Sequence, residues 1–264
     1  MQDNCVITDI HSHVLPDIDD GPSDMKEANE LLSLLYESGV DRLICTSHYM
    51  SPHFDVEKAH LAECFNHVTE YIKGVDTCPT LQLGAEVRLS SHLLDDIITK
   101  SVPTLGNTPY VLVEFPGNEM SNENVEIAYE LTVHGYSLIM AHPERNFAIQ
   151  KDNRILEKLL DLGIILQLTA GCFIHGRHHD RLADKLAWSI LKNGQATVIA
   201  SDTHNSFTRP PTLLKAYKII EREFGEKVVE DLIDNANAIW NGRPCSEVNV
   251  KADKLMFSLF KANK

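Results

Sequence analysis

The chain has 264 residues, of which 43% are hydrophobic and 23% are charged. This is the composition of an ordinary globular protein, and it excludes a disordered, collagen-like or coiled-coil chain. The formal net charge is −14. A surface that acidic repels phosphate backbones, so we expect no nucleic acid among the partners.

The sequence contains no segment that would direct the chain to a membrane or out of the cell. No stretch approaches the roughly 18 apolar residues of a membrane span, and the first residues lack the basic and apolar regions of a secretion signal. The six cysteines form no Cys-x-x-Cys pair, which is typical of reduced thiols. We therefore predict a cytoplasmic protein without membrane insertion.

Short apolar runs rich in β-branched residues recur along the chain and predict buried strands. There are seven of them, at Val6–Ile10, Arg42–Thr46, Thr80–Leu83, Tyr110–Val113, Leu138–Ala141, Ile164–Leu168 and Thr197–Ala200.

The segments between the strands have helical spacing. Asp24 and Glu27 predict a capping box that opens a helix over Met25–Ser38, which ends at Gly39. The other expected helices are Phe54–Lys73, Ser91–Lys100, Asn122–His134, Asn153–Leu162, Arg181–Lys192, Pro211–Phe224 and Glu226–Asn235.

Seven strands alternating with helices predict a parallel sheet built from βα units, in one α/β domain over residues 1–247. Seven units favour a closed or nearly closed barrel, and the alternative is an open doubly wound sheet. The tail, residues 248–264, is weakly basic and carries an apolar cluster around Phe257. We expect it to dock on the domain rather than to bind a partner.

Polar residues of the metal-ligating kinds follow six of the seven predicted strands. They are His11 and His13 after the first strand, His48 after the second, Glu86 after the third, Glu114 after the fourth, His142 after the fifth, and Asp202 and His204 after the seventh. Taken singly, each has an ordinary explanation as a hydrogen-bonded histidine or a solvated rim charge. In a barrel, however, the carboxyl ends of the strands meet on one face, so the set together predicts a metal site.

The spacing within two of these segments supports the same interpretation. Side chains two residues apart on a strand point the same way, so His11 and His13 can bind one ion, and Asp202 and His204 repeat that geometry. The turn Asp19-Asp20-Gly21, just after the first strand, could add a ligand. Arg145 and Arg209 follow two of the strands, and a guanidinium group suits phosphate. Metals and arginines together favour phosphoester hydrolysis.

Other phosphate chemistries lack their motifs. No cysteine has an arginine six positions later, as a cysteine-dependent phosphatase loop requires, and neither a Walker A sequence nor a G-x-G-x-x-G sequence is present.

The motifs DIHSHVLPDIDDG, TSHY, GAEVRL, LVEFP, AHPERN and SDTHN, in that order, resemble those of the PHP (polymerase and histidinol phosphatase) superfamily. The first motif together with HPER is more specific, and it is similar to the bacterial manganese-dependent protein-tyrosine phosphatases of capsule and exopolysaccharide operons, the CpsB or CapC type. The segment NANAIWNGRP resembles the closing helix of that family.

This resemblance implies a distorted seven-stranded (β/α) barrel of the PHP type that holds three divalent metal ions. Manganese is expected, with iron, zinc, cobalt or magnesium as alternatives. By position, one ion would be held by His11, His13, Glu86 and Asp202, a second by Glu86, Glu114 and His142, and the third by Asp20, His48 and His204. Arg145 and Arg209 match the phosphate-binding arginines. The implied substrate is phosphotyrosine in the tail of a bacterial tyrosine autokinase that controls polysaccharide export.

The chain departs from the family pattern after the sixth strand, where it has Gln167-Leu168-Thr169-Ala170-Gly171, followed by a cationic loop over Gly176–Arg181. This departure affects the rim of the site that would face the substrate. Arg177 and Arg181 in the loop can also be interpreted as ordinary surface charges. Two other functions remain open. They are a phosphatase of small metabolites, of the histidinol-phosphatase kind, and a non-catalytic metal-binding module. The complete set of nine expected ligands disfavours the second of these.

Overall fold

The computed structural model describes residues 5–51, 53–54, 56, 58–99, 101–117, 120–175 and 181–250. Most of the expected tail, from residue 251 onward, and residues 176–180 of the cationic loop, including Arg177, lie outside the described residues. None of the described helices is both long enough and apolar enough to cross a membrane.

The strands are all parallel to their neighbours and form two sheets. The first sheet has the order β1-β2-β4 and the second the order β3-β5-β6-β7-β8-β9. Their bounds are β1 Thr8–Ser12, β2 Arg42–Cys45, β3 His48–Tyr49, β4 Thr80–Leu83, β5 Glu86–Arg88, β6 Tyr110–Glu114, β7 Ser137–Ala141, β8 Ile165–Thr169 and β9 Val198–Ala200. The predicted α/β class with a parallel arrangement is confirmed.

The second and third expected strands appear as β2 and β4. Each is followed by a further short strand that we did not expect, β3 after β2 and β5 after β4. Between β4 and β5, a Cβ atom on Gly84 would lie 2.7 Å from the side chain of Leu105 and 2.9 Å from that of Ile44, so the close packing there requires glycine. The chain thus crosses from the three-stranded sheet to the six-stranded sheet at two places.

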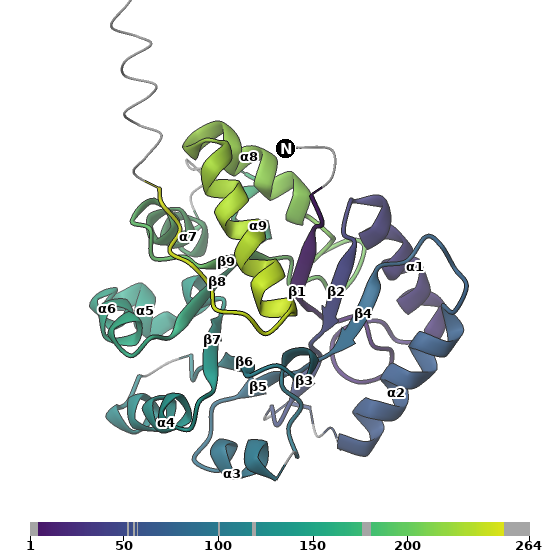
Figure 1. The fold of residues 1–264 in the computed structure, drawn as a ribbon, viewed down its shortest axis with the longest axis horizontal. Coiled ribbons are helices and arrows are strands. Elements are labelled where there is room, and N and C mark those ends of the chain that lie inside the picture. Colours follow the sequence, from purple (N-terminus) through teal and green to yellow (C-terminus); the bar gives the residue numbers. More distant parts are fainter. Residues whose placement is uncertain are drawn as a thin grey trace, which may run out of the picture.

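The far edges of the two sheets also approach each other. Ser12 at the end of β1 forms an isolated parallel bridge with Thr203, which follows β9, and the amide of His13 donates to the carbonyl of Thr203 (2.8 Å). Figure 1 shows the strands curling around a common centre with the helices outside them. The described residues therefore form two curled sheets with nine strands, rather than the single barrel of seven strands that we expected.

The described α-helices follow the expected order with a few changes of bounds. They are α1 Met25–Glu37, α2 Lys58–Tyr71, α3 Leu93–Ile98, α4 Asn122–Val133, α5 Phe147–Lys151, α6 Arg154–Asp161, α7 Leu182–Lys192, α8 Leu213–Phe224 and α9 Glu226–Trp240. The short helix α5 was not expected. The expected capping box of α1 is half formed, because Asp24 accepts from the amide of Glu27 (2.9 Å) while the Glu27 carboxylate accepts from Ser23.

Helix α9 is longer than expected because its buried face continues past Asn235 to Trp240. It packs against β1 and β9 and contributes Ala236, Ile239 and Trp240 to an apolar cluster inside the curled sheets. A larger apolar cluster lies between the strands and the surrounding helices. Apolar clusters thus cover both faces of the strands. The candidate site lies at the carboxyl ends of the strands.

Candidate metal centre

The predicted ligands from distant parts of the chain converge at the carboxyl ends of the strands. Among the described residues, three groups bring their ligand atoms within 4.8 Å of one another. The groups are His13, Asp20, His48 and His204; His11, His13 and Asp202; and His11, Glu86 and His142. Eight of the nine residues that we predicted as ligands therefore belong to the groups, and Glu114 does not.

The two histidines of the His-x-His motif form the centre of the site. Both are fully buried, and their Nε2 atoms lie 3.1 Å apart. The Oε2 atom of Glu86 lies 3.4 Å from His11 Nε2 and 3.3 Å from His13 Nε2, and the Oδ1 atom of Asp202 lies 3.4 and 3.7 Å from the same two nitrogens. Strand alternation thus directs both imidazoles into one site, as the spacing predicted.

Glu86 contacts more imidazoles than any other carboxylate in the three groups. It is 1% exposed. Its Oε1 atom lies 2.7 Å from His142 Nε2, and its Oε2 atom lies 3.1 Å from His48 Nδ1 and close to both central histidines. Burial by itself would raise the pKa of Glu86, but the charges of His11 and His142 outweigh burial and hold that pKa well below its usual range. Glu86 is therefore an ionised carboxylate surrounded by four imidazoles.

The group of His13, Asp20, His48 and His204 reaches the solvent-exposed side of the site, because the side chain of Asp20 is about half exposed. Asp20 Oδ1 is 3.1 Å from His204 Nε2 and 3.7 Å from His48 Nε2. The ring of His204 stacks on that of His13 with 3.8 Å between the centroids. Burial, followed by the charge of His13, lowers the pKa of His204 to about 4. The imidazole of His204 is therefore neutral near pH 7, the form that binds a cation.

Two side chains that we did not assign as ligands orient the central histidines. Nδ1 of His13 donates to Asp19 (2.7 Å), and Nδ1 of His11 donates to the amide oxygen of Gln167 (2.8 Å). The Gln167 amide nitrogen in turn donates to the carbonyl of Leu168 (2.9 Å), which sets the direction of its oxygen. These bonds leave both Nε2 atoms facing the site. Histidines that bind metals commonly donate their other ring N–H to an acceptor in this way, which fixes the orientation of the ring.

The sequence places Asp19 in the same turn as Asp20, with nothing to distinguish the roles of the two residues. Gln167 stands out in the sequence only as part of the departure from the family pattern. The period-two alternation of the sixth strand was the one signal available for Gln167, because it places that side chain on a defined face of the strand.

Both predicted phosphate-binding arginines lie at the site. Arg145 ends a short 3-10 turn over Pro143–Arg145, and its Nη1 atom is 2.7 Å from Asp202 Oδ2. Arg209 Nη2 lies 2.5 Å from Asp202 Oδ1, and its Nη1 atom donates to His204 Nε2 (2.7 Å). The two arginines line a cavity of about 200 Å³ together with His48, Glu114 and His142. The side chain of Arg145 is 37% exposed, so the cavity opens to solvent.

Glu114 lies at the edge of this cavity and has a different partner. Its Oε2 atom is 3.0 Å from Arg88 Nη1, and its side chain is 28% exposed. It comes from the end of β6, beside β5, as the strand order requires. Its position is compatible with the predicted role, but its present contact is an ion pair with a neighbouring strand.

The donor set of the three groups fits divalent metal ions. The Oε2 atom of Glu86 is buried without a hydrogen-bond donor, and the two buried carboxylate oxygens of Asp202 are paired with the cations Arg145 and Arg209. Burial lowers the pKa of His13, but Asp19 and Glu86 outweigh it and raise that pKa to about 10. Positive charge is thus favoured between these carboxylates, and imidazole with carboxylate is a ligand set typical of manganese, iron or zinc.

A family model of capsular polysaccharide synthesis proteins, CpsB/CapC, matches residues 7–241. The chain belongs to the CpsB/CapC family. The matched range contains all nine predicted metal ligands and both arginines, so the whole site lies within the family region, and the resemblance seen in the motifs is confirmed.

Relatives and a solved structure agree with this assignment. The chain is 30% identical over 235 residues to the tyrosine-protein phosphatase CpsB of Streptococcus pneumoniae, covering 88% of this chain and 97% of that one. It is 34% identical to CapC of Staphylococcus aureus over 79% of this chain and 81% of that one. A crystal structure described with YwqE from Bacillus subtilis and CpsB from S. pneumoniae, as unique metal-dependent tyrosine phosphatases, matches with a TM-score of 0.85 and 26% identity. That match covers 91% of this chain and 97% of the other.

Proposed function

We propose that this CpsB/CapC-family protein is a metal-dependent tyrosine-protein phosphatase. The observation that carries the proposal is the convergence of eight metal-ligating side chains and two arginines at one solvent-open cavity. Metal-ligating groups beside guanidinium groups are what hydrolysis of a phosphate monoester needs, because the phosphate must be both bound and neutralised. The family relatives named as tyrosine-protein phosphatases support the same activity.

The proposed cofactor is a set of three divalent ions, manganese before iron, zinc, cobalt or magnesium. The first ion would be held by His11, His13, Glu86 and Asp202, the second by Glu86, Glu114 and His142, and the third by Asp20, His48 and His204. Ions in such a site lower the pKa of water toward neutrality and stabilise negative charge on phosphoryl oxygens. The contacts of Glu86 with imidazoles of all three sets support its place as a bridging carboxylate.

Arg145 and Arg209 are proposed to bind the phosphate group. Both guanidinium groups now contact Asp202. With a cation bound to Asp202, that carboxylate would no longer need these partners, and the two guanidinium groups would be available to pair with phosphate oxygens at the cavity. A guanidinium fork can pair with two oxygens at once and with the charge that builds in the transition state.

The finer parts of the proposal concern the substrate and the setting. The substrate is phosphotyrosine in the tail of a tyrosine autokinase that regulates capsule or exopolysaccharide synthesis, and the reaction takes place in the cytoplasm. The partial exposure of Arg145 supports a protein substrate, since an open site admits a side chain that is part of a polypeptide.

We further propose that residues 1–247 form one domain and that the two sheets close into one distorted seven-stranded barrel. The bridge between Ser12 and Thr203 supports this closure.

One assay tests the activity. The protein is stripped of metal with a chelator, its metal content is measured, and it is reloaded with manganese. We expect the metal-free protein to be inactive and the reloaded protein to hydrolyse a phosphotyrosine peptide much faster than a phosphoserine peptide or histidinol phosphate. Full activity after verified metal removal would refute the metal dependence. A preference for histidinol phosphate would replace the proposed substrate with a small metabolite.

A further inference from the structure

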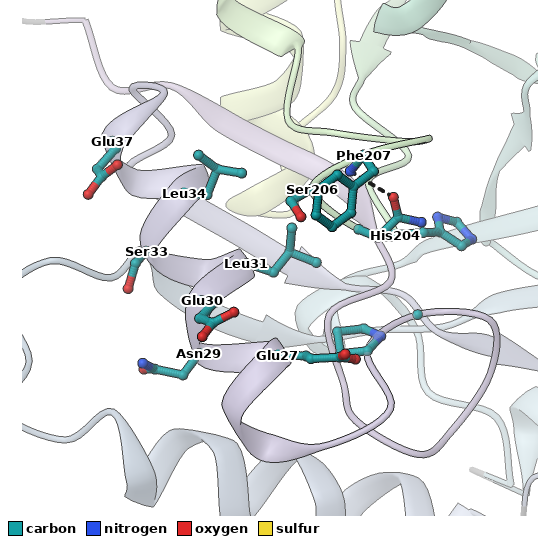
Figure 2. A pocket seen from close by; sticks show the side chains of 13 residues that line it. Glu27, Asn29, Glu30, Leu31, Ser33, Leu34, Glu37, His204, Ser206 and Phe207 are labelled. Carbon is teal, nitrogen blue, oxygen red and sulfur yellow. Dashed lines mark hydrogen bonds between the residues drawn. The ribbon is translucent and has the colours of Figure 1, made fainter.

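A groove of about 520 Å³ runs beside the metal centre, between helix α1 and the loop that follows His204. Figure 2 shows the side chains of Leu31 and Leu34 on the helix facing the loop that carries Ser206 and Phe207. His204 lines this groove and also belongs to the metal-ligating group with Asp20. A chain lying in the groove would therefore lead directly into the site.

The lining of the groove combines apolar surface with negative charge. Leu31 is buried, whereas the side chain of Phe207 is 89% exposed. So large an exposed fraction is unusual for an aromatic side chain that packs against no partner. The groove also includes Glu27, Glu30 and Glu37, and no lysine or arginine lines it among the residues that the structure describes. A ligand with positive charge and an apolar side chain would complement both properties.

The loop that presents Phe207 is held in place by a side chain. Asn205 accepts hydrogen bonds from the amides of Phe207 (3.0 Å) and Thr208 (2.7 Å), and it also accepts from the hydroxyl of Thr208. The same loop continues to Arg209, which contacts Asp202 at the site. The exposed aromatic ring and the phosphate-binding arginine are thus carried by one short, hydrogen-bonded segment.

The three acidic side chains of the groove differ in the hydrogen bonds and ion pairs that they make within the protein. Glu27 accepts from the amide and hydroxyl of Ser23 at the start of the helix. Glu30 lies 3.7 Å from Lys26, but both side chains are largely exposed, so this pair is weak. Glu37 is the last residue of α1 and is exposed. From Glu27 to Glu37 the helix rises about 15 Å, which corresponds to about four or five residues of extended peptide.

From these observations we infer that the groove binds the part of the substrate polypeptide next to the phosphotyrosine, and that it selects lysine or arginine together with an apolar side chain there. The inference rests on the proposed function. Net charge supports it independently, since a phosphotyrosine carries about two negative charges and the protein carries −14. A basic flank on the substrate offsets the repulsion between them during encounter.

The test compares two phosphotyrosine peptides on the manganese-loaded full chain, one with lysines and leucine beside the phosphotyrosine and one with glutamates and serine. Each kcat/KM is divided by that of the same protein for phenyl phosphate, which is too small to reach along the groove. We expect the wild type to prefer the lysine peptide by about tenfold at low salt. The preference should largely vanish at an ionic strength of about 1 M, where the Debye length is about 3 Å.

Two double variants that change the net charge by the same amount distinguish an effect of the groove from an effect of the protein's overall charge. Glu30→Lys with Glu37→Lys should abolish the tenfold preference for the lysine peptide, and Phe207→Ala should reduce it about threefold. In the matched control, Glu126→Lys with Glu130→Lys alters two exposed residues on α4, away from α1 (Figure 1), and should retain at least about half of the preference.

The outcomes distinguish the inference from the proposed function. The inference would be overturned if the wild type turned over both peptides at the same normalised rate. It would also be overturned if the groove variant and the control variant lost the preference for the lysine peptide to the same extent. If peptide turnover instead rises with salt in the wild type but not in the groove variant, the chain's own residues 251–264, which include four lysines, occupy the groove, and the inference is wrong. Absence of turnover of both peptides and of phenyl phosphate would refute the phosphatase itself.

Discussion

Replacing Glu86 by glutamine should damage the site more than any other single neutral replacement of a carboxylate in it. The carboxylate lies within 2.7 to 3.4 Å of four imidazole nitrogens, from His11, His13, His48 and His142. A glutamine has nearly the same shape, but one of its two ends is an amide nitrogen that offers hydrogens rather than lone pairs. It therefore could not take the proposed place of a bridging carboxylate, and it removes one unit of negative charge from the centre of the site.

The expected loss follows from this geometry. Removing one positioned electrostatic group from an active site costs about a hundredfold or more in turnover, which corresponds to about 2.7 kcal/mol of transition-state stabilisation. Glu114→Gln is the matched comparison, because Glu114 pairs with Arg88 at the cavity edge and is 28% exposed. We expect that variant to lose about tenfold or less.

The assay measures bound metal by elemental analysis and kcat/KM for an aryl phosphate at saturating manganese, with circular dichroism to confirm folding. Glu86→Gln should bind less metal than the wild type and turn over at least about a hundredfold more slowly. If Glu86→Gln kept both its metal and its turnover, the bridging role would be refuted. If Glu114→Gln lost as much as Glu86→Gln, the distinction drawn from their contacts would be wrong.

Three further changes test separate parts of the site. Arg145→Ala should keep full metal content but hydrolyse aryl phosphates at least about tenfold more slowly, and Arg145→Lys should also be impaired because it lacks the bidentate fork; normal kinetics in either would contradict phosphate binding. Gln167→Leu should weaken metal binding about 10- to 100-fold, measured by titration with manganese, because Nδ1 of His11 loses its acceptor; unchanged affinity would show that Gln167 does not orient the ring. Burial, followed by the charge of Glu144, raises the pKa of Cys172 far above its usual range, so thiol-alkylating reagents should leave turnover within about twofold, and rapid inactivation would point to a cysteine nucleophile.

Much of the site was predictable because its signals are local in sequence. The alternation of a strand places His11 and His13 on one side, and the carboxyl ends of parallel strands meet at one edge. These two rules were sufficient to predict that residues as distant as His11 and His204 would lie together, and the structure places them in adjoining groups. The choice of imidazole and carboxylate side chains then indicated metal chemistry without any knowledge of the fold's details.

Tertiary structure alone decided which polar group each ligand meets. The contacts of Asp19 with His13 and of Gln167 with His11 join residues 6 and 156 positions apart, and neither pairing has a sequence signal of its own. The same holds for Glu114, whose pairing with Arg88 depends on β5 and β6 being neighbours in the sheet.

The two unexpected short strands, β3 and β5, have a similar cause. The apolar run of the second expected strand continues to Cys45 without a break in pattern, yet the chain leaves the first sheet there and joins the second at His48. Close packing around Gly84 makes the equivalent crossing on the third strand possible. Hydrophobic pattern determines that a segment is extended and buried, but the path of the whole chain sets which neighbour completes its hydrogen bonds. The sequence therefore indicated seven of the strands and the candidate ligands. Only the fold decided the two extra strands, the curled sheets and the groove beside α1.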